Sequence, residues 1–120
     1  MERVVAHVRN IVKQQGTFKP LMVTDIDGVL VRGPTPVTGT RDAVLALKAA
    51  GIPLALLTNG GGNLEAIKAD KMNETFKEEL FDRNLMFMSH SPIRPHLHKY
   101  SQEGGVLLLT GSLKITDIVD

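Results

Sequence analysis

The sequence predicts an α/β fold, in which a parallel sheet carries helices on both faces. Short apolar runs typical of buried strands alternate with segments whose apolar residues recur at helical spacing. Strands that are separated by helices pair in parallel through right-handed crossovers. The chain has 120 residues, of which 42% are hydrophobic and 22% are charged. These values are typical of one globular domain.

The expected elements follow one another along most of the chain. The strands are predicted at residues 21–24, 52–57, 85–88 and 106–109, and the helices at residues 41–50, 64–80, 92–101 and in a last turn after Ser112. Pro20 stands at the start of the first strand, where a missing N–H is tolerated. The second strand is a continuous apolar run, which favours burial on both of its faces.

Turn and cap residues mark the boundaries of the helices. Thr40 and Asn63 have side chains that can cap the first and second helices, and Gly51 can end the first. Residues 28–39 are rich in Gly and Pro, so we expect them to form a loop.

Residues 1–19 form a basic segment with two interpretations. It carries four basic residues against the single acid Glu2, and its apolar residues recur at helical spacing. We favour a surface helix that packs on the domain. The alternative is an organelle-targeting segment, although the Ser enrichment of many such segments is missing.

The composition excludes several classes of site. The net charge is +1, which gives no electrostatic argument for binding nucleic acid. The absence of Cys excludes disulfides, thiolate metal sites and a Cys nucleophile, and it is compatible with a reducing compartment such as the cytoplasm. No apolar run approaches the roughly 20 residues that span a bilayer.

The most informative residues are Asp25 and Asp27, directly after the first expected strand. Acids two residues apart on an extended chain point the same way. Their mutual repulsion is tolerable where a divalent cation or a reacting phosphate neutralises it. Gly28 then allows a sharp turn. The alternative, a solvated strand exit, is weakened by the apolar residues on both sides.

A second polar group follows the second expected strand. Thr58, Asn59 and Gly60 offer a hydroxyl and amide donors to an anion, and the next helix would present its N-terminus there. Ligands of open parallel sheets bind at the carboxyl ends of the strands. If the two strands are neighbours, both groups converge. Alone, the Gly-rich segment would read as a flexible turn.

These residues resemble motifs of the haloacid dehalogenase superfamily of phosphohydrolases, whose core is Rossmann-like. Residues 25–30 are similar to its first motif and residues 56–59 to its second. Residues 27–33, 57–62 and 89–92 are similar to class IIA and to its eukaryotic branch named for the cat eye syndrome critical region. The resemblance covers roughly residues 21–111.

The resemblance implies a role for each matching residue. Asp25 would be the nucleophile that forms an aspartyl-phosphate, and also a Mg²⁺ ligand. Asp27 would be the general acid/base, with its carbonyl oxygen on the metal. Thr58 would hold the transferring phosphoryl group, helped by Asn59 and Gly60. The implied partner is a small phosphorylated substrate, and the branch implies mitochondria and a link to phospholipid metabolism.

The later motifs of the family lack a match in this chain. The family has a third-motif Lys and a fourth-motif acidic cluster after a cap domain, whereas Lys99, Lys114, Asp117 and Asp120 lie in other contexts. We therefore expect residues 20–120 to be a partial core without cap or C-terminal half. Alone it would have weak or no phosphatase activity and an uncovered apolar sheet face. The alternative is a degenerate, non-catalytic module that retains the fold.

Other candidates receive less support from the sequence. A phospho-accepting receiver domain would need adjacent acids on the first strand and an acceptor Asp on the third, where Ser89 and His90 stand instead. His96 and His98 lack the further ligands that zinc needs. His90 follows a strand, so we expect a structural or substrate-adjacent role.

Overall fold

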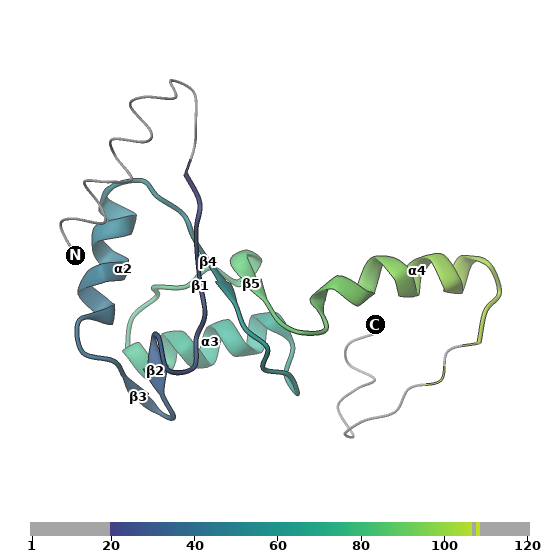
Figure 1. Cartoon of the computed structure of the whole chain (residues 1–120), viewed down its shortest axis with the longest axis horizontal. Coiled ribbons are helices and arrows are strands. Elements are labelled where there is room, and N and C mark those ends of the chain that lie inside the picture. Colours follow the sequence, from purple (N-terminus) through teal and green to yellow (C-terminus); the bar gives the residue numbers. More distant parts are fainter. Residues whose placement is uncertain (1–19, 107, 109–120) are drawn as a thin grey trace.

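The computed structural model describes residues 20–106 and 108, and it confirms the parallel α/β fold (Figure 1). The strands are β1 (Met22–Thr24), β2 (Val31–Arg32), β3 (Thr35–Pro36), β4 (Leu54–Leu57) and β5 (Met86–Phe87). The α-helices are α2 (Thr40–Ala49), α3 (Glu65–Phe76) and α4 (Arg94–Gln102), and two 3₁₀ turns are η1 (Arg83–Leu85) and η2 (Ser91–Ile93). No described helix has the length and hydropathy needed to cross a bilayer.

The main sheet has three parallel strands in the order β1-β4-β5. Thr24 pairs with Leu56, and Leu56 in turn pairs with Met86. The chain therefore moves across the sheet in one direction. Successive right-handed crossovers in one direction place their helices on the same side of the sheet.

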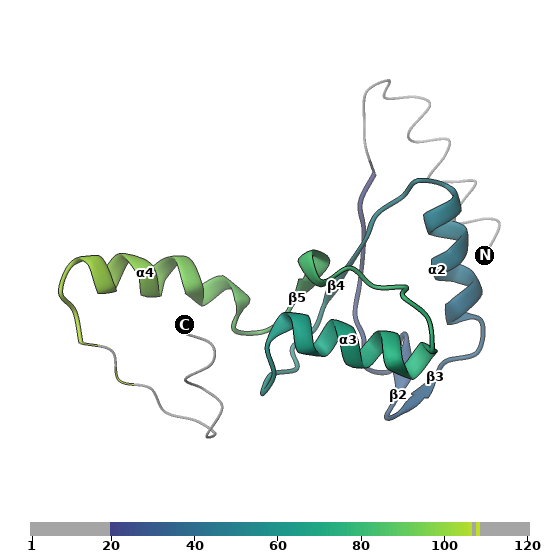
Figure 2. The same ribbon diagram turned by 180° about the vertical axis from the view of Figure 1, so that it is seen from behind.

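The burial of the strand residues agrees with this placement. Leu56 and Met86 are buried, and they share a core cluster with residues from both helices, namely Val44 of α2 and Ala69, Met72 and Phe76 of α3. Figure 2 shows α3 crossing in front of the strands, which lie in front of it in Figure 1. The described residues thus supply the expected helix layer on one face.

The other face of the sheet is exposed within the described part of the chain. Val23, Leu57 and Phe87 point to it and are 51%, 55% and 43% exposed. Only Ala55 and Leu56 of β4 are buried, so the prediction that the second strand is buried on both faces was wrong for Leu57. Its far side lacks a covering layer here.

Helix α2 begins one residue earlier than predicted. Thr40 lies inside the helix, and its hydroxyl donates to the carbonyl oxygen of Leu30 at 3.3 Å. The N-cap is Gly39, which adopts a left-handed conformation without a side-chain cap. The prediction that Thr40 caps the helix was therefore wrong, because its hydroxyl is hydrogen-bonded to Leu30 in the loop after β1. Gly51 ends the helix as expected, at a φ of 66°.

Helix α3 is shorter than the predicted segment. Its N-cap is Leu64, and Asn63 instead accepts a hydrogen bond from the Lys71 ammonium at 3.1 Å. The helix ends at Phe76 because Lys77 takes a left-handed conformation, with a φ of 55°. The Asn63 cap and the extension of the helix to residue 80 were therefore wrong.

Two further differences concern the loop after β1 and the region after residue 101. Residues 28–39 contain the antiparallel hairpin β2–β3, where the sequence predicted only a loop. Helix α4 extends away from the sheet (Figure 1). Val106 and Leu108 lie outside any strand, and the rest of the expected fourth strand, the last helical turn and the basic segment 1–19 lie outside the described residues.

Candidate functional site

The two acids of the first motif share one side of the chain after β1. Asp25 and Asp27 are exposed, whereas Ile26 between them is fully buried in the core. The buried side chain anchors the segment, so the acids on either side must face away from the core. This arrangement is the one that the spacing predicts.

The backbone after the acids turns back on itself. The carbonyl oxygen of Ile26 accepts from the amides of Leu30 and Val31, at 2.9 and 3.1 Å. The amide of Gly28 donates to Val31 at 2.7 Å, and Gly28 adopts a φ of 83°. A side chain would strain that backbone conformation, which explains the Gly of the motif. The turn holds the two acids at the edge of the sheet.

Thr58 lies directly after β4 and is buried, with 3% exposure. Its amide donates to the carbonyl oxygen of Phe87 at 3.0 Å, and its hydroxyl oxygen accepts from the amide of Gly60 at 3.1 Å. Because the oxygen is used as an acceptor, the hydroxyl proton is available for an anion. The Gly60 amide is directed at Thr58, and Asn59 is exposed.

The sheet brings the two motifs to one edge. β1 and β4 are adjacent and parallel, and Thr24 pairs with Leu56. Asp25 and Thr58 follow these paired residues within one and two positions. Both groups therefore lie at the carboxyl ends of neighbouring strands, where open parallel sheets bind ligands.

A second polar cluster at this end was not predicted. We call Glu65, His90, Ser91 and Arg94 the carboxyl-end cluster. The Ser91 hydroxyl donates to Glu65 Oε1 at 2.5 Å, and Arg94 Nη2 donates to Oε2 at 3.0 Å. His90 Nε2 lies 3.5 Å from Oε1. The resemblance of residues 89–92 to a family motif pointed to this turn, but no local pattern linked it to Glu65.

The cluster keeps Glu65 ionised although its side chain is only 11% exposed. Burial alone would raise the pKa of this carboxyl. The hydrogen bond from Ser91, a backbone hydrogen bond and the nearby Arg94 and His90 outweigh burial, so the pKa lies below its ordinary value. His90 Nε2 is buried and has no hydrogen-bond partner among the described residues.

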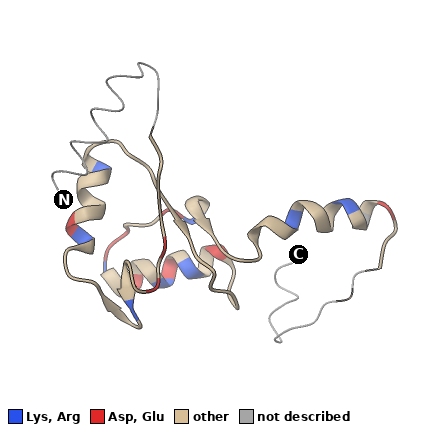
Figure 3. Ribbon diagram, viewed as in Figure 1, with Lys and Arg blue, Asp and Glu red and all other residues tan. Residues whose placement is uncertain are grey.

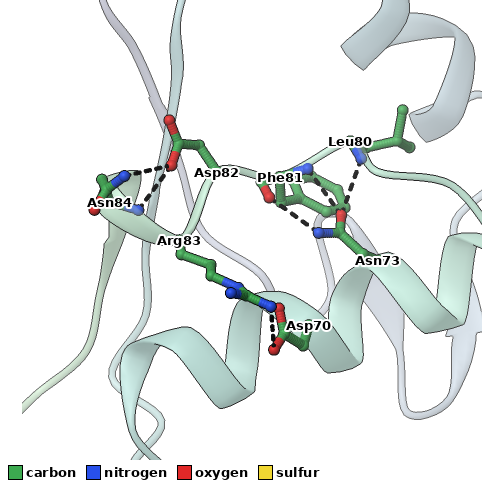
Figure 4. A network of polar contacts seen from close by, with 7 residues as sticks. All are labelled: Asp70, Asn73, Leu80, Phe81, Asp82, Arg83 and Asn84. Atoms are coloured by element: carbon green, nitrogen blue, oxygen red, sulfur yellow. Dashed lines mark hydrogen bonds and ion pairs between the residues drawn. The ribbon is translucent and has the colours of Figure 1, made fainter.

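The middle and the C-terminal half of α3 carry a different polar network, shown in Figure 4. We call it the amino-end network, and it consists of Asp70, Asn73, Leu80, Phe81, Asp82, Arg83 and Asn84. Arg83 forms a two-point ion pair with Asp70, and Asn73 bonds the backbone of Leu80 and Phe81. A hollow of about 630 Å³ beside this network lies at the amino ends of the strands, away from Asp25.

The donor atoms available to a cation are oxygens. Neither carboxylate of Asp25 and Asp27 makes a hydrogen bond or ion pair within residues 20–106. In the same range, no three acidic or His side chains group closely enough to enclose a metal. Mg²⁺ is commonly held by one or two carboxylates, water and a substrate phosphate, so this pair fits that ion. Figure 3 shows acidic and basic residues interspersed along α2 and α3.

Comparison with known proteins identifies a family. The model of the haloacid dehalogenase-like hydrolases matches residues 22–120. A mitochondrial hydrolase of Saccharomyces cerevisiae is 37% identical over 78 residues, which are 65% of this chain and 22% of that protein. A cardiolipin synthase (CMP-forming)/mitochondrial hydrolase fusion protein of Schizosaccharomyces pombe is 36% identical over 86 residues, 72% of this chain and 14% of that protein.

Two solved structures share the fold. A hypothetical protein from Pyrococcus horikoshii OT3 superposes with a TM-score of 0.59 at 27% identity, covering 68% of this chain and 30% of that one. NagD from E. coli K-12 gives a TM-score of 0.58 at 20% identity, covering 77% and 42%. The chain thus spans less than half the length of each of these four proteins.

Proposed function

Because the chain belongs to the haloacid dehalogenase-like hydrolases, we propose that it carries the nucleophile half of a Mg²⁺-dependent phosphohydrolase site. The observation that supports this most is the pairing of β1 with β4. That pairing brings the exposed acids Asp25 and Asp27 and the buried hydroxyl of Thr58 to one edge of the sheet.

The proposed reaction has two displacements. A carboxylate oxygen of Asp25 attacks phosphorus, the bond to the leaving oxygen breaks, and Asp27 gives that oxygen its proton. Water then attacks the aspartyl-phosphate while Asp27 takes a proton from it, which releases phosphate and restores Asp25. A carboxylate nucleophile divides one difficult displacement into two easier ones.

Thr58 and the segment after it would hold the phosphoryl group. The Thr58 hydroxyl donates to a phosphoryl oxygen while its own oxygen accepts from Gly60. That bond orients the hydroxyl before the substrate arrives, which lowers the ordering cost. Asn59 is exposed next to it and can add a side-chain amide donor.

Asp25 and the carbonyl oxygen of Asp27 would hold Mg²⁺, which when bound offsets negative charge on the phosphoryl oxygens. The need for such a cation follows from the charges. Within the described residues neither carboxylate has a basic partner, so the pair would otherwise repel an incoming phosphate.

The finer assignments are part of this proposal and rest on the motif resemblance and on the names of the relatives. We place the chain in class IIA, with a small phosphate ester as substrate, and we propose a mitochondrial location with a link to phospholipid metabolism. The names of the two fungal relatives support this location. Residues 1–19 then form a separate N-terminal segment and residues 20–120 a partial core.

Hydrolysis of an aryl phosphate tests the nucleophile. In a protein of the relatives' full length, we expect Asp25→Asn to lower turnover at least about 10³-fold with Mg²⁺ present. Chelation of Mg²⁺ should have a similar effect. Unchanged turnover in the variant would exclude Asp25 as the nucleophile.

The second candidate function is a non-catalytic module that retains the fold. It is motivated by Lys99, Lys114, Asp117 and Asp120, which stand outside the contexts of the family's later motifs. The same assay on the 120-residue chain, combined with a measurement of phosphate binding, separates the two. Sustained hydrolysis that Asp25→Asn abolishes would contradict the non-catalytic module, and a chain that neither hydrolyses the ester nor binds phosphate would support it.

A further inference from the structure

Glu65 makes contacts that its position in the helix does not explain. It lies in the first turn of α3, where acids commonly cap the helix or face water. Here its carboxylate is buried and, besides a backbone hydrogen bond at Glu65 itself, its oxygens accept from Ser91 and Arg94. Glu65 therefore joins the start of α3 to the turn that follows β5.

Ser91 connects the Glu65 carboxylate to the backbone of the turn after β5. Its hydroxyl donates to Glu65 at 2.5 Å and accepts from the Met88 amide at 2.8 Å, while the Ser91 amide donates to the Met88 carbonyl at 3.0 Å. One hydroxyl thus connects the carboxylate to a turn whose first residue, Met88, is almost fully buried. Loss of the hydroxyl would leave the Met88 amide and the Glu65 carboxylate without this partner.

The same turn lies against the segment that holds Thr58. The Ser89 hydroxyl donates to the Gly60 carbonyl oxygen at 3.4 Å, and a Cβ on Gly61 would lie 3.5 Å from Ser89 Oγ. Just before the turn, Phe87 accepts the hydrogen bond of the Thr58 amide. Residues 58–61 are therefore held from the side by residues 87–91, whose turn is anchored on Glu65.

We propose that Glu65 is a positioning residue for the phosphate-binding segment 58–61, acting through Ser91 on the turn after β5. The phosphate-binding part of this statement depends on the proposed function, but the positioning of the segment does not. Loss of the anchor allows the turn to shift, which misplaces the Thr58 hydroxyl relative to the phosphate.

Substitutions at Ser91 give the cleanest test, because Thr and Val have the same shape and differ by one hydroxyl. The 120-residue chain is labelled with ¹⁵N and titrated with inorganic phosphate in Mg²⁺. We expect Glu65→Ala and Ser91→Val to weaken phosphate binding about tenfold, and Ser91→Thr to stay within about twofold of the native chain. Asp70→Asn, which breaks an exposed ion pair in the middle of the same helix, is the control and should leave binding unchanged.

Hydrogen exchange without phosphate measures the positioning separately. The amides of Thr58 and Gly60 should exchange faster in Glu65→Ala and Ser91→Val than in Ser91→Thr, Asp70→Asn or the native chain. Equal exchange rates and equal phosphate affinities in Ser91→Val and Ser91→Thr would overturn the inference, even if Glu65→Ala does not fold. A native chain that binds no phosphate, with exchange rates that follow the Ser91 hydroxyl, would contradict the proposed function and leave the positioning role supported.

Discussion

Two polar clusters join α3 to the β5 region, and they differ in how completely their groups are paired. The carboxyl-end cluster lies at the start of α3, and the amino-end network lies in its middle and C-terminal half. In the amino-end network, the hydrogen-bonding groups of the Asn73 side chain are paired within the network. Its carbonyl oxygen accepts from the amides of Leu80 and Phe81, and its NH₂ group donates to the carbonyl oxygen of Phe81 (Figure 4). At the carboxyl ends of the strands, the exposed side chains of Asp25 and Asp27 make no hydrogen bond or ion pair within the described residues. Fully paired polar groups stabilise a fold, whereas unpaired ones at one sheet edge are available for a ligand.

The ion pairs of the two clusters differ in solvent exposure. Asp70 and Arg83 are 41% and 65% exposed, so water competes for their charges, although Asp70 raises the pKa of Arg83. Glu65 is 11% exposed and bonds through both oxygens. We infer that the amino-end network stabilises the fold and that the carboxyl-end cluster supports the candidate site. The following substitutions test this division.

The largest expected effect on stability is at Asn73. Asn73→Ala removes three hydrogen bonds of about 1 kcal/mol each, so we expect a loss of about 3 kcal/mol. Urea denaturation measures it, with Asn84→Ala as the matched control because Asn84 is exposed and should cost about 0.5 kcal/mol or less. Phosphate affinity of the folded Asn73→Ala chain should remain native, and a lowered affinity would break the division.

Thr58→Val should lower phosphate affinity, whereas Asn73→Ala lowers stability. It keeps the shape of a buried side chain but removes the hydroxyl, and a hydrogen bond to a charged group contributes about 1.5–3 kcal/mol. We therefore expect phosphate binding to weaken about 10- to 100-fold, as calorimetry in Mg²⁺ would measure. Thr38→Val, at an exposed position before α2, is the control. Equal affinities of the two variants would remove Thr58 from the site.

A smaller effect of opposite sign is expected at Lys77. Its φ of 55° is strained for a residue with a side chain, so Lys77→Gly should raise the free energy of unfolding by about 0.5–1 kcal/mol. Lys71→Gly, inside α3, should lower it by about 1 kcal/mol. Thermal denaturation of the two variants should therefore shift in opposite directions, and a shift in the same direction would refute the strain.

The smallest effect concerns the pH dependence of stability. Because the pKa of Glu65 is lower in the folded chain than its ordinary value of 4.5, ionised Glu65 stabilises the fold above pH 4.5. This contribution is lost as the pH falls through the folded-state pKa. Urea denaturation at pH 7 and at pH 3.5 should show a stability advantage over Glu65→Gln that shrinks on acidification. A constant advantage would contradict the lowered pKa.

Most of the fold was predictable because its signals are local. The three strands of the main sheet and the positions of α2 and α4 follow from apolar runs and helical spacing. The caps failed at Thr40 and Asn63 because each side chain found a partner outside the local pattern, in Leu30 and Lys71. The hairpin β2–β3 was missed because two-residue strands produce no apolar period.

For the candidate site, the sequence alone determined which groups are present: two carboxylates at one strand end and a hydroxyl at another, with the glycines that let the backbone turn there. Only the tertiary structure decided that β1 and β4 are neighbours, that α2 and α3 cover the same face, and that Glu65 anchors the turn after β5. The physical reason is distance along the chain. Spacing reports which side chains share an element, whereas a bond such as that between Glu65 and Ser91, 26 residues apart, arises only when the elements pack.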